Sequence, residues 1–284
     1  MLKQIRGNTP NFVFLFEVWQ TCNCNFCRLA VSSLAEIMKY LLASTRFVLF
    51  VFVTLFLYSV WFIGSFIIPN KPFWRQLLFR LWAISFIKIA GIEVEVIGTP
   101  PQQPFFLVCN HLGYVDIPVL RAIVDSVFVG KKEIKDWFLA GRIVSDMETI
   151  FIDRQNNRDI LRAGEEILEK LNAGEGVIVF PEGTSSKGEE VLKFNSSFLE
   201  FPARVDFPVH YASITYQTPN NNPPANTICW WGDDTFLEHL WKILQIPRFK
   251  AIVTFGEQPI QNPNRKELAK ILHQKVSEIF VPVL

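Results

Sequence analysis

Phe105-Phe-Leu-Val-Cys109 is an uninterrupted apolar run that leads directly into the polar stretch Asn110-His111-Leu-Gly-Tyr-Val-Asp116. A short apolar run followed by a polar loop is typical of a strand buried on both faces, as in a parallel sheet. The same arrangement occurs at residues 149–154 (Thr-Ile-Phe-Ile-Asp-Arg) and at residues 177–186 (Val-Ile-Val-Phe-Pro-Glu-Gly-Thr-Ser-Ser). The sequence therefore predicts a parallel sheet whose polar loops gather at the carboxyl ends of its strands.

Further strands and helices alternate on both sides of this stretch. Helices are predicted at residues 158–171, at residues 265–280 with Asn264 as N-cap, and from Phe236 onward with Asp233 or Asp234 as the cap. Strands are predicted at residues 94–97, 105–109, 127–129, 150–152, 177–180, 209–215, 227–231 and 251–255. This alternation predicts an α/β fold with a mainly parallel central sheet flanked by helices.

The N-terminal part has a different character. Residues 47–68 are 22 residues without a charge, enough to cross a hydrocarbon core of about 30 Å; the alternative is a buried core helix. Residues 73–90 mix apolar and basic side chains, which is typical of a helix lying in the membrane interface. Between Lys39 and Lys88 there are six basic residues and no acidic one, which suits an anionic lipid surface. Together these segments predict a membrane-embedded helix or helical hairpin.

The chain is predicted to have three parts. Residues 1–37 show no sustained period and precede Met38, so we interpret them as a leader, either disordered or upstream of the natural start. Residues 38–92 form the membrane anchor and interfacial helix, and residues 93–284 form the α/β domain. Cys22, Cys24 and Cys27 lie in the leader, where no histidine supplies a fourth zinc ligand.

Composition narrows the function class. The chain has 28 Lys+Arg and 27 Asp+Glu, so it lacks the basic excess of a nucleic-acid binder. Half of its residues are hydrophobic, with 27 Phe and 8 Trp, which excludes disorder and suggests lipid contact. Five cysteines without a framework spacing do not demand an oxidising compartment. We therefore expect a membrane protein whose larger part faces the cytosol.

The loop after residue 109 carries a candidate acid–base pair. A helix beginning near Tyr114 would turn the Asp116 carboxylate back towards the His111 imidazole. A carboxylate that holds one ring nitrogen fixes the tautomer, which leaves the other nitrogen to take a proton from a hydroxyl. The alternative is a surface histidine near a helix-capping aspartate.

The other two loops carry candidate anion-binding groups. Arg154 ends an apolar strand, where a guanidinium suits a phosphate; the alternative is a solvated arginine that starts the next helix. Glu182, Gly183 and Thr184 follow Pro181, and backbone amides around a glycine turn can hold an oxyanion or a phosphate. The alternative here is an ordinary turn.

Other reactive side chains are interpreted as structural. Cys109 as an acyl-thioester carrier competes with a buried cysteine that acts as a small hydrophobe. His210, His239 and His273 have no acidic partner at a telling spacing.

The three loops in this order resemble a known family. Asn-His-x4-Asp, then Phe-Ile-Asp-Arg, then Phe-Pro-Glu-Gly-Thr, behind a hydrophobic N-terminal segment, is similar to the glycerolipid acyltransferases of the lysophosphatidate acyltransferase family. The resemblance covers residues 40–215. Segments 131–133 (Lys-Lys-Glu) and 193–194 (Lys-Phe) also resemble the family's sequence after the first and third blocks. The resemblance implies His111 as general base, Asp116 as its orienting partner, Arg154 as the phosphate contact, and Glu182, Gly183, Thr184 and Lys193 as substrate-binding residues.

Two positions depart from the family pattern. Glu148 stands where the family usually has a glycine three residues before the phenylalanine of the second block. The fourth block reads Phe207-Pro-Val-His-Tyr211, so Tyr211 replaces a second proline. Both changes bear on substrate shape and not on the proton-transfer pair.

The resemblance implies a membrane-bound O-acyltransferase that needs no metal or bound cofactor. Its donor would be acyl-CoA or acyl-carrier protein, and its acceptor a lysophospholipid, foremost 1-acyl-glycerol 3-phosphate, which gives phosphatidic acid. The alternative acceptors are a lyso-ornithine lipid or lysophosphatidylcholine. The rival class is a non-catalytic membrane lipid-binding protein on the same fold, although a binder has no use for an oriented base.

Overall fold

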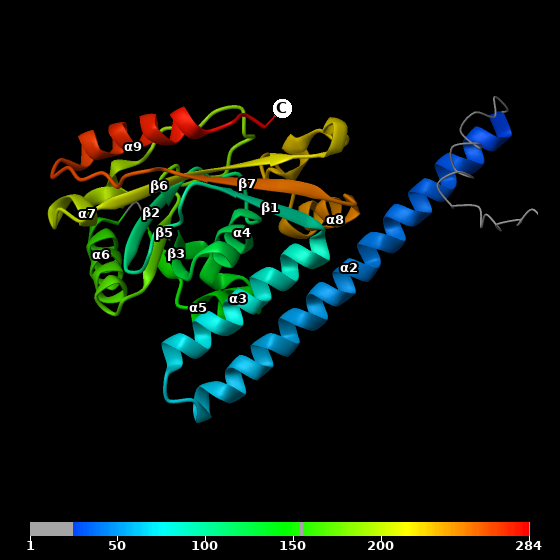
Figure 1. Ribbon diagram of the computed structural model, residues 1–284. Helices are drawn as coiled ribbons and strands as arrows, with labels where there is room; N and C mark the ends of the chain where they lie inside the picture. The colour runs from blue at the N-terminus through cyan, green and yellow to red at the C-terminus, as the bar shows by residue number, and fades with distance from the viewer. Residues whose placement is uncertain (1–24, 154–155, 284) are drawn as a thin grey trace, which may run out of the picture.

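A mixed sheet forms the centre of the molecule (Figure 1). The computed structural model describes residues 25–153 and 156–283, and within them the strand order is β1-β7-β6-β2-β5-β3-β4. Neighbouring strands are parallel except for the β6–β7 pair, which is antiparallel. The strands are β1 (Ile92–Ile97), β2 (Phe105–Cys109), β3 (Ser126–Lys131), β4 (Ile150–Ile152), β5 (Gly176–Val179), β6 (Val209–Gln217) and β7 (Phe249–Phe255).

Strand β2 shows why the apolar runs predict this sheet. Phe105, Leu107 and Cys109 face one hydrophobic core, while Phe106 and Val108 face the other. Successive strand side chains point to opposite faces, so a strand covered on both sides is apolar throughout.

Helices cover both faces of the sheet. One face is covered by α3 (Lys71–Ala90), α4 (Asp116–Ile123) and α8 (Phe236–Gln245), and the other by α6 (Asn157–Asn172), α7 (Glu200–Arg204) and α9 (Arg265–Ile279). Helix α5 (Ala140–Asp146) and the short 3₁₀ helices η1 (Lys132–Asp136), η2 (Ser196–Leu199), η3 (Pro219–Asn221) and η4 (Ala225–Ile228) lie in connections. The predicted fold class is confirmed.

Two local predictions are wrong. Residues 227–231 are not a strand. Ile228 ends η4 and Cys229 follows it, and both are buried, while Trp230 donates its N–H to the Leu112 carbonyl. These apolar residues therefore fill the core without joining the sheet. Helix α8 is capped by Thr235 and not by Asp233 or Asp234. The Thr235 hydroxyl accepts from the Glu238 N–H while the Glu238 carboxylate accepts from the Thr235 N–H, a reciprocal capping box.

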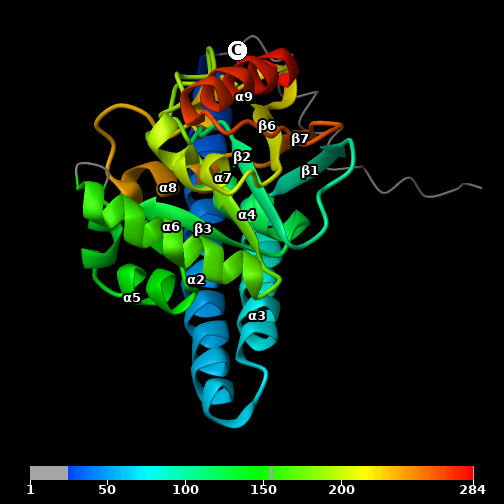
Figure 2. The ribbon, with the colours of Figure 1, turned by 90° about the vertical axis from the view of Figure 1, so that its left-hand side faces the viewer.

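An antiparallel helical hairpin precedes the sheet. Helix α2 (Asn25–Ile67) and α3 are joined by a short turn, and Figures 1 and 2 show its tip pointing away from the sheet. The segment Ser32–Ile67 is long and apolar enough to cross a membrane. Many of its large apolar side chains are exposed, among them Val48, Phe52, Leu55, Phe56, Ile63 and Phe66. Helix α2 runs through Met38 without a break, so the boundary after residue 37 stays a prediction.

The hairpin is fastened to the α/β domain by charged groups. The Arg46 guanidinium donates to the carbonyl oxygens of Ile246 (2.6 Å) and Pro247 (2.7 Å) near the end of α8. Arg75, only 2% exposed, pairs with the buried Glu175, and Arg80 pairs with Asp125 at 3.7 Å. Three of the six basic residues interpreted as lipid contacts therefore bind protein groups, because the hairpin packs on the domain. Gly91 (φ 72°) alone links α3 to β1.

Candidate active site

The loop between β2 and α4 wraps around one carboxylate oxygen. Asp116 Oδ2 accepts from His111 Nδ1 (2.8 Å), from the Leu112 N–H (2.7 Å) and from the Gly113 N–H (3.0 Å). Asp116 is the first residue of α4 and is fully buried, whereas the His111 side chain is 20% exposed. The structure thus brings together His111 and Asp116, the predicted pair. The turn between them returns the carboxylate to the imidazole.

These contacts determine which ring nitrogen of His111 can act as a base. A carboxylate that accepts two backbone N–H groups also accepts the ring N–H, so we assign the proton to Nδ1. Nε2 then carries the lone pair, and within residues 25–153 and 156–283 it has no hydrogen-bond partner. The unprotonated nitrogen is the one available to a substrate hydroxyl.

Two side chains that sequence reasoning missed hold this loop. The Tyr216 hydroxyl donates to Asp116 Oδ1 at 2.6 Å. Asn110 bridges to β6, accepting from the Ile214 N–H (2.8 Å) and donating to the Ile214 carbonyl (3.0 Å). Asn110 stands next to His111 in the first motif, but Tyr216 lies 100 residues beyond Asp116, and its only sequence signal is a hydroxyl in an apolar strand.

The third loop packs against the first. The Phe180 ring stacks on the His111 imidazole with centroids 4.2 Å apart, and the Ser186 N–H donates to the His111 carbonyl at 3.0 Å. Gly113 allows Trp230 to approach, because a Cβ there would lie 3.0 Å from Trp230 atoms. The imidazole is therefore fixed from several sides.

Glu182 is the second carboxyl group of the site. Its Oε1 accepts from the His111 N–H at 3.2 Å, and its Oε2 is buried without a partner among the described residues. Burial raises the pKa of Glu182 to about 8, because a charged carboxylate is costly away from water. A protonated Glu182 can donate a hydrogen bond as well as accept one.

The remaining predicted site residues are Gly183, Thr184, Lys193 and Arg154. Gly183 takes a positive φ of 71° directly after Glu182, and Thr184 is exposed beside it. Lys193 is exposed, and no contact to His111 is found for it in the part of the chain that the structure describes. Arg154 lies outside the described residues.

The structure shows how the chain accommodates the two departures from the family pattern. Glu148 has a φ of 61°, a conformation that glycine adopts easily, and its carboxylate pairs with Lys170 and with Arg75 (3.1 Å). Tyr211 packs its ring on Gly256, where a Cβ would come within 2.2 Å of the ring.

The competing reactive groups are held in structural roles. Cys109 is fully buried, and burial raises the pKa of its thiol well above the ordinary value, which disfavours a thiolate. His239 contacts the Tyr114 hydroxyl and the Cys229 carbonyl. The side chains of Cys22, Cys24 and Cys27 are not described, and the described residues contain no group of three or more His, Cys, Asp or Glu suited to a metal ion.

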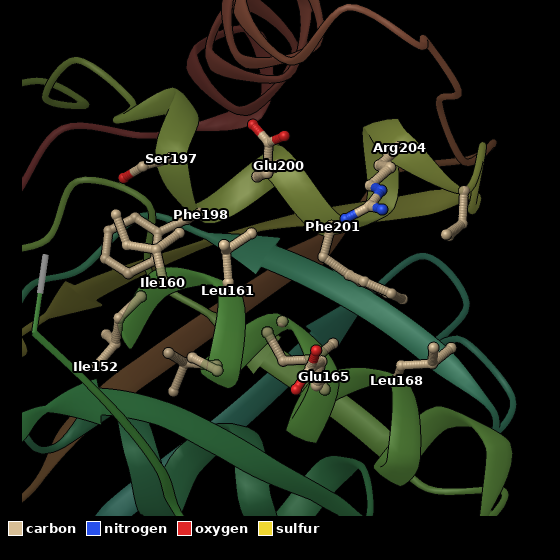
Figure 3. Close-up of a pocket in the computed structure, with 15 residues that line it drawn as sticks. Ile152, Ile160, Leu161, Glu165, Leu168, Ser197, Phe198, Glu200, Phe201 and Arg204 are labelled. Carbon is tan, nitrogen blue, oxygen red and sulfur yellow. The ribbon is translucent and has the colours of Figure 1, made fainter. Parts of the chain in front are cut away.

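A cavity of about 400 Å³ lies between α6 and the η2–α7 segment (Figure 3). Ile160, Leu161, Leu168, Phe198 and Phe201 line it, with Arg204 at its edge. Its walls belong to the core on the opposite face of the sheet from Leu112 and α4. It is therefore separate from the His111 site.

The fold and the site together define a class of enzyme: an acyltransferase with a carboxylate-oriented histidine at the carboxyl edge of a mostly parallel sheet. The Acyltransferase family model matches residues 92–215. The chain is 32% identical to a lyso-ornithine lipid O-acyltransferase of Pseudomonas aeruginosa, over 71% of this chain and 78% of that protein. It is 28% identical to a 1-acyl-sn-glycerol-3-phosphate acyltransferase of Neisseria meningitidis serogroup B, over 58% of this chain and 64% of that protein.

A solved structure has the same fold. The crystal structure of the 1-acyl-sn-glycerophosphate acyltransferase PlsC from Thermotoga maritima aligns with a TM-score of 0.62 and 21% identity, covering 86% of this chain and 97% of that one. The chain belongs to the lysophosphatidate acyltransferase family.

Proposed function

We propose that this enzyme moves a fatty acyl group from a thioester to the free hydroxyl of a lysolipid in the membrane. The observation that carries the proposal is the His111–Asp116 contact, which leaves Nε2 as an unprotonated base at the site. The acceptor expected from the motifs is 1-acyl-glycerol 3-phosphate, and the product would be phosphatidic acid.

The chemistry follows from the positions of these groups. His111 Nε2 removes the hydroxyl proton as the acceptor oxygen forms a bond to the thioester carbonyl carbon. The tetrahedral oxyanion collapses, the carbon–sulfur bond breaks, and the leaving sulfur takes the proton from the imidazolium. Asp116 stabilises that imidazolium through Nδ1.

Glu182 and Arg154 are the proposed acceptor-binding groups. Glu182 would bind an acceptor hydroxyl, and the buried Oε2 without a partner among the described residues supports this role. Arg154 ends the second block, and a guanidinium pairs strongly with phosphate. Gly183, Thr184 and Lys193 remain proposed substrate contacts on the motif resemblance.

The donor and the orientation are parts of the same proposal. Acyl-CoA or acyl-carrier protein would supply the thioester, and both carry their thiols in the cytosol. The free cysteines Cys109 and Cys229 are compatible with a reducing compartment. We therefore place the active site on the cytosolic side of the membrane.

A second acceptor is favoured by one specific observation. The relatives named lyso-ornithine lipid O-acyltransferase include the 32% identical one, which matches more of this chain than the 1-acyl-sn-glycerol-3-phosphate acyltransferase described above. A lyso-ornithine lipid offers a free hydroxyl and the same acyl-transfer chemistry, but no phosphate.

The test offers purified enzyme lysophosphatidate, lyso-ornithine lipid and lysophosphatidylcholine in parallel, with one acyl-CoA, and measures release of free thiol. Turnover should be confined to one acceptor, and His111→Ala should lower it by about 10²–10⁴-fold. If lysophosphatidate is the acceptor, Arg154→Ala should raise its half-saturating concentration more than that of the donor. Thiol release that persists in His111→Ala at more than a tenth of wild type contradicts the general-base role.

A further inference from the structure

In addition to the exposed side chains of the hairpin, a second apolar surface lies beside the active site. Trp137, Phe138 and Leu139 follow one another between η1 and α5 and are 39%, 90% and 56% exposed. Leu237, at the start of α8, is 61% exposed, and the neighbouring Phe236 ring lies 5.9 Å from the Trp137 ring. We call Trp137, Phe138, Leu139 and Leu237 the apolar rim.

The exposure of the rim is built into the backbone. The Ala140 N–H donates to the Phe138 carbonyl (2.6 Å) and the Gly141 N–H to the Trp137 carbonyl (2.7 Å). Gly141 permits this tight turn, because a Cβ there would lie 2.2 Å from the Lys135 carbonyl oxygen. Leu139 (φ 56°, ψ −49°) is the central residue of a γ-turn, a rare and strained conformation. A strained backbone turn thus holds these side chains towards the solvent.

The rim adjoins the apolar helix of the hairpin. The Tyr58 hydroxyl of α2 donates to Asp146 Oδ2 on α5 at 2.6 Å, and Phe47 of α2 packs edge-on against Trp241 of α8 with centroids 6.2 Å apart. Figure 2 shows α5 and α8 on the same side of α2. Helix α8, which carries Leu237, and helix α5, which follows Leu139, therefore both contact α2 within the segment whose other apolar side chains are exposed.

Cationic side chains border the rim. A shallow hollow of about 380 Å³ is lined by Lys135 and Arg142 together with Trp137, Leu139 and the acidic Asp146. Arg142 is exposed and pairs with Asp146 at 2.9 Å. Aromatic and apolar side chains beside lysine and arginine suit the boundary between lipid headgroups and acyl chains, where the apolar parts are buried and the cations face phosphates.

Aromatic contacts connect the rim to the catalytic loop. The Trp137 and Trp230 ring centroids are 6.4 Å apart, and the Trp230 and Tyr114 centroids are 5.5 Å apart. Tyr114 belongs to the loop between His111 and Asp116. We propose that the apolar rim is a second membrane-contacting surface, which enters the headgroup region of an anionic bilayer and keeps the mouth of the active site against it. This proposal rests on membrane attachment and not on the identity of the acceptor.

The test measures the depth of the rim in a bilayer. Cys22, Cys24 and Cys27 are replaced by Ser in the full chain, and Phe138→Cys is labelled with an environment-sensitive dye; the native Cys109 and Cys229 are buried. The matched control is Gln274→Cys, on an exposed position of α9. Each protein is reconstituted in phosphatidylcholine vesicles with and without phosphatidylglycerol, containing lipids spin-labelled near the top of the acyl chain.

We expect the spin-labelled lipids to quench the dye at position 138 several-fold more than at position 274, and more strongly in vesicles with phosphatidylglycerol. Equal quenching at the two positions overturns the proposal. A dye whose emission changes only with protein concentration indicates that a second copy covers the rim, which also overturns it. Equal quenching in the two kinds of vesicle overturns the role of the Lys135–Arg142 hollow.

The same labels on His111→Ala separate this proposal from the proposed function. Quenching needs no turnover, so the inactive enzyme should give the same depth. Phe138→Asp supplies a second readout, because a 90% exposed side chain can be replaced without disturbing the core. This variant should stay in the membrane through α2 and lose several-fold in activity on bilayer substrate while keeping its activity on substrate dispersed in detergent. Equal losses in both assays contradict a membrane role for the rim.

Discussion

The Tyr216 hydroxyl donates to Asp116 Oδ1, and the other oxygen of the same carboxylate accepts from the His111 ring. The acid–base pair is therefore a chain of three side chains from three elements: β6, the start of α4 and the loop after β2. Asp116 is held at both oxygens, which prevents its carboxylate from turning away from the imidazole.

Tyr216→Phe tests this positioning role. A hydrogen bond to a charged group contributes about 1.5–3 kcal/mol, so we expect kcat to fall by about ten-fold or more. The half-saturating concentrations of both substrates should stay unchanged, because Tyr216 is buried and does not face them. Tyr58→Phe removes the hydroxyl bond from α2 to Asp146, outside the Tyr216–Asp116–His111 chain, and is the control. A rise in KM without a change in kcat would contradict the role.

Asp116→Asn tests the charge of the orienting group. The amide oxygen should take the Oδ2 position, where it keeps the bonds from the Leu112 and Gly113 N–H groups and from Nδ1, while the NH₂ group faces the Tyr216 hydroxyl. The neutral amide no longer stabilises the imidazolium, so we expect kcat to fall by about 10²–10⁴-fold, with the protein still in the membrane fraction. Asp233→Asn, which changes an exposed aspartate before α8, is the matched control. The assay is thiol release in membranes that contain equal amounts of each enzyme.

The raised pKa of Glu182 predicts how the unfolding free energy depends on pH. Its pKa is about 8 in the folded protein against an ordinary value of 4.5, so the folded state holds a proton that the unfolded chain has lost between these values. The unfolding free energy should therefore fall as pH rises from 4.5 to 8, by at most about 4–5 kcal/mol from this group. Glu182→Gln cannot ionise and should lack this component.

Thermal unfolding in detergent measures the difference. We expect the midpoint of the wild type to fall relative to that of Glu182→Gln by roughly 5–15 °C across this pH range. Two parallel curves would show that Glu182 titrates normally in the folded protein.

The buried Arg75–Glu175 ion pair should contribute to the stability of the packing between the hairpin and the α/β domain. Glu175→Ala leaves the Arg75 guanidinium buried without its main partner, which typically costs about 3–5 kcal/mol. The double variant Arg75→Met/Glu175→Leu removes both charges and should lose much less. Lys250→Ala, in an exposed pair with Glu95, should cost no more than about 1 kcal/mol. Thermal midpoints in detergent compare the three. A Glu175→Ala midpoint equal to that of Lys250→Ala would show that the pair does not secure the hairpin.

Local patterns predicted much of the fold and the centre of the site. The apolar runs at 105–109 and 150–152 became strands with those bounds, because a strand buried on both faces has no polar position. His111 and Asp116 were predictable because a single turn joins them. Tyr216 and the Arg75–Glu175 pair were not, since each contact joins residues 100 positions apart and depends on how the elements pack. The run at 227–231 was misinterpreted because burial in a connection leaves the same apolar pattern as burial in a strand.

The single-residue link at Gly91 limits how this enzyme can be re-engineered. A Cβ at Gly91 would lie 2.5 Å from the Pro247 carbonyl oxygen and 2.6 Å from the Arg46 guanidinium, so this position does not tolerate a bulkier residue. The anchor is consequently not a detachable module. Exchanging it for another membrane tether, or cutting it away to obtain a water-soluble enzyme, would expose the apolar faces of α4 and α8 and displace the first strand of the sheet. Any working graft would have to carry the hairpin and β1 together.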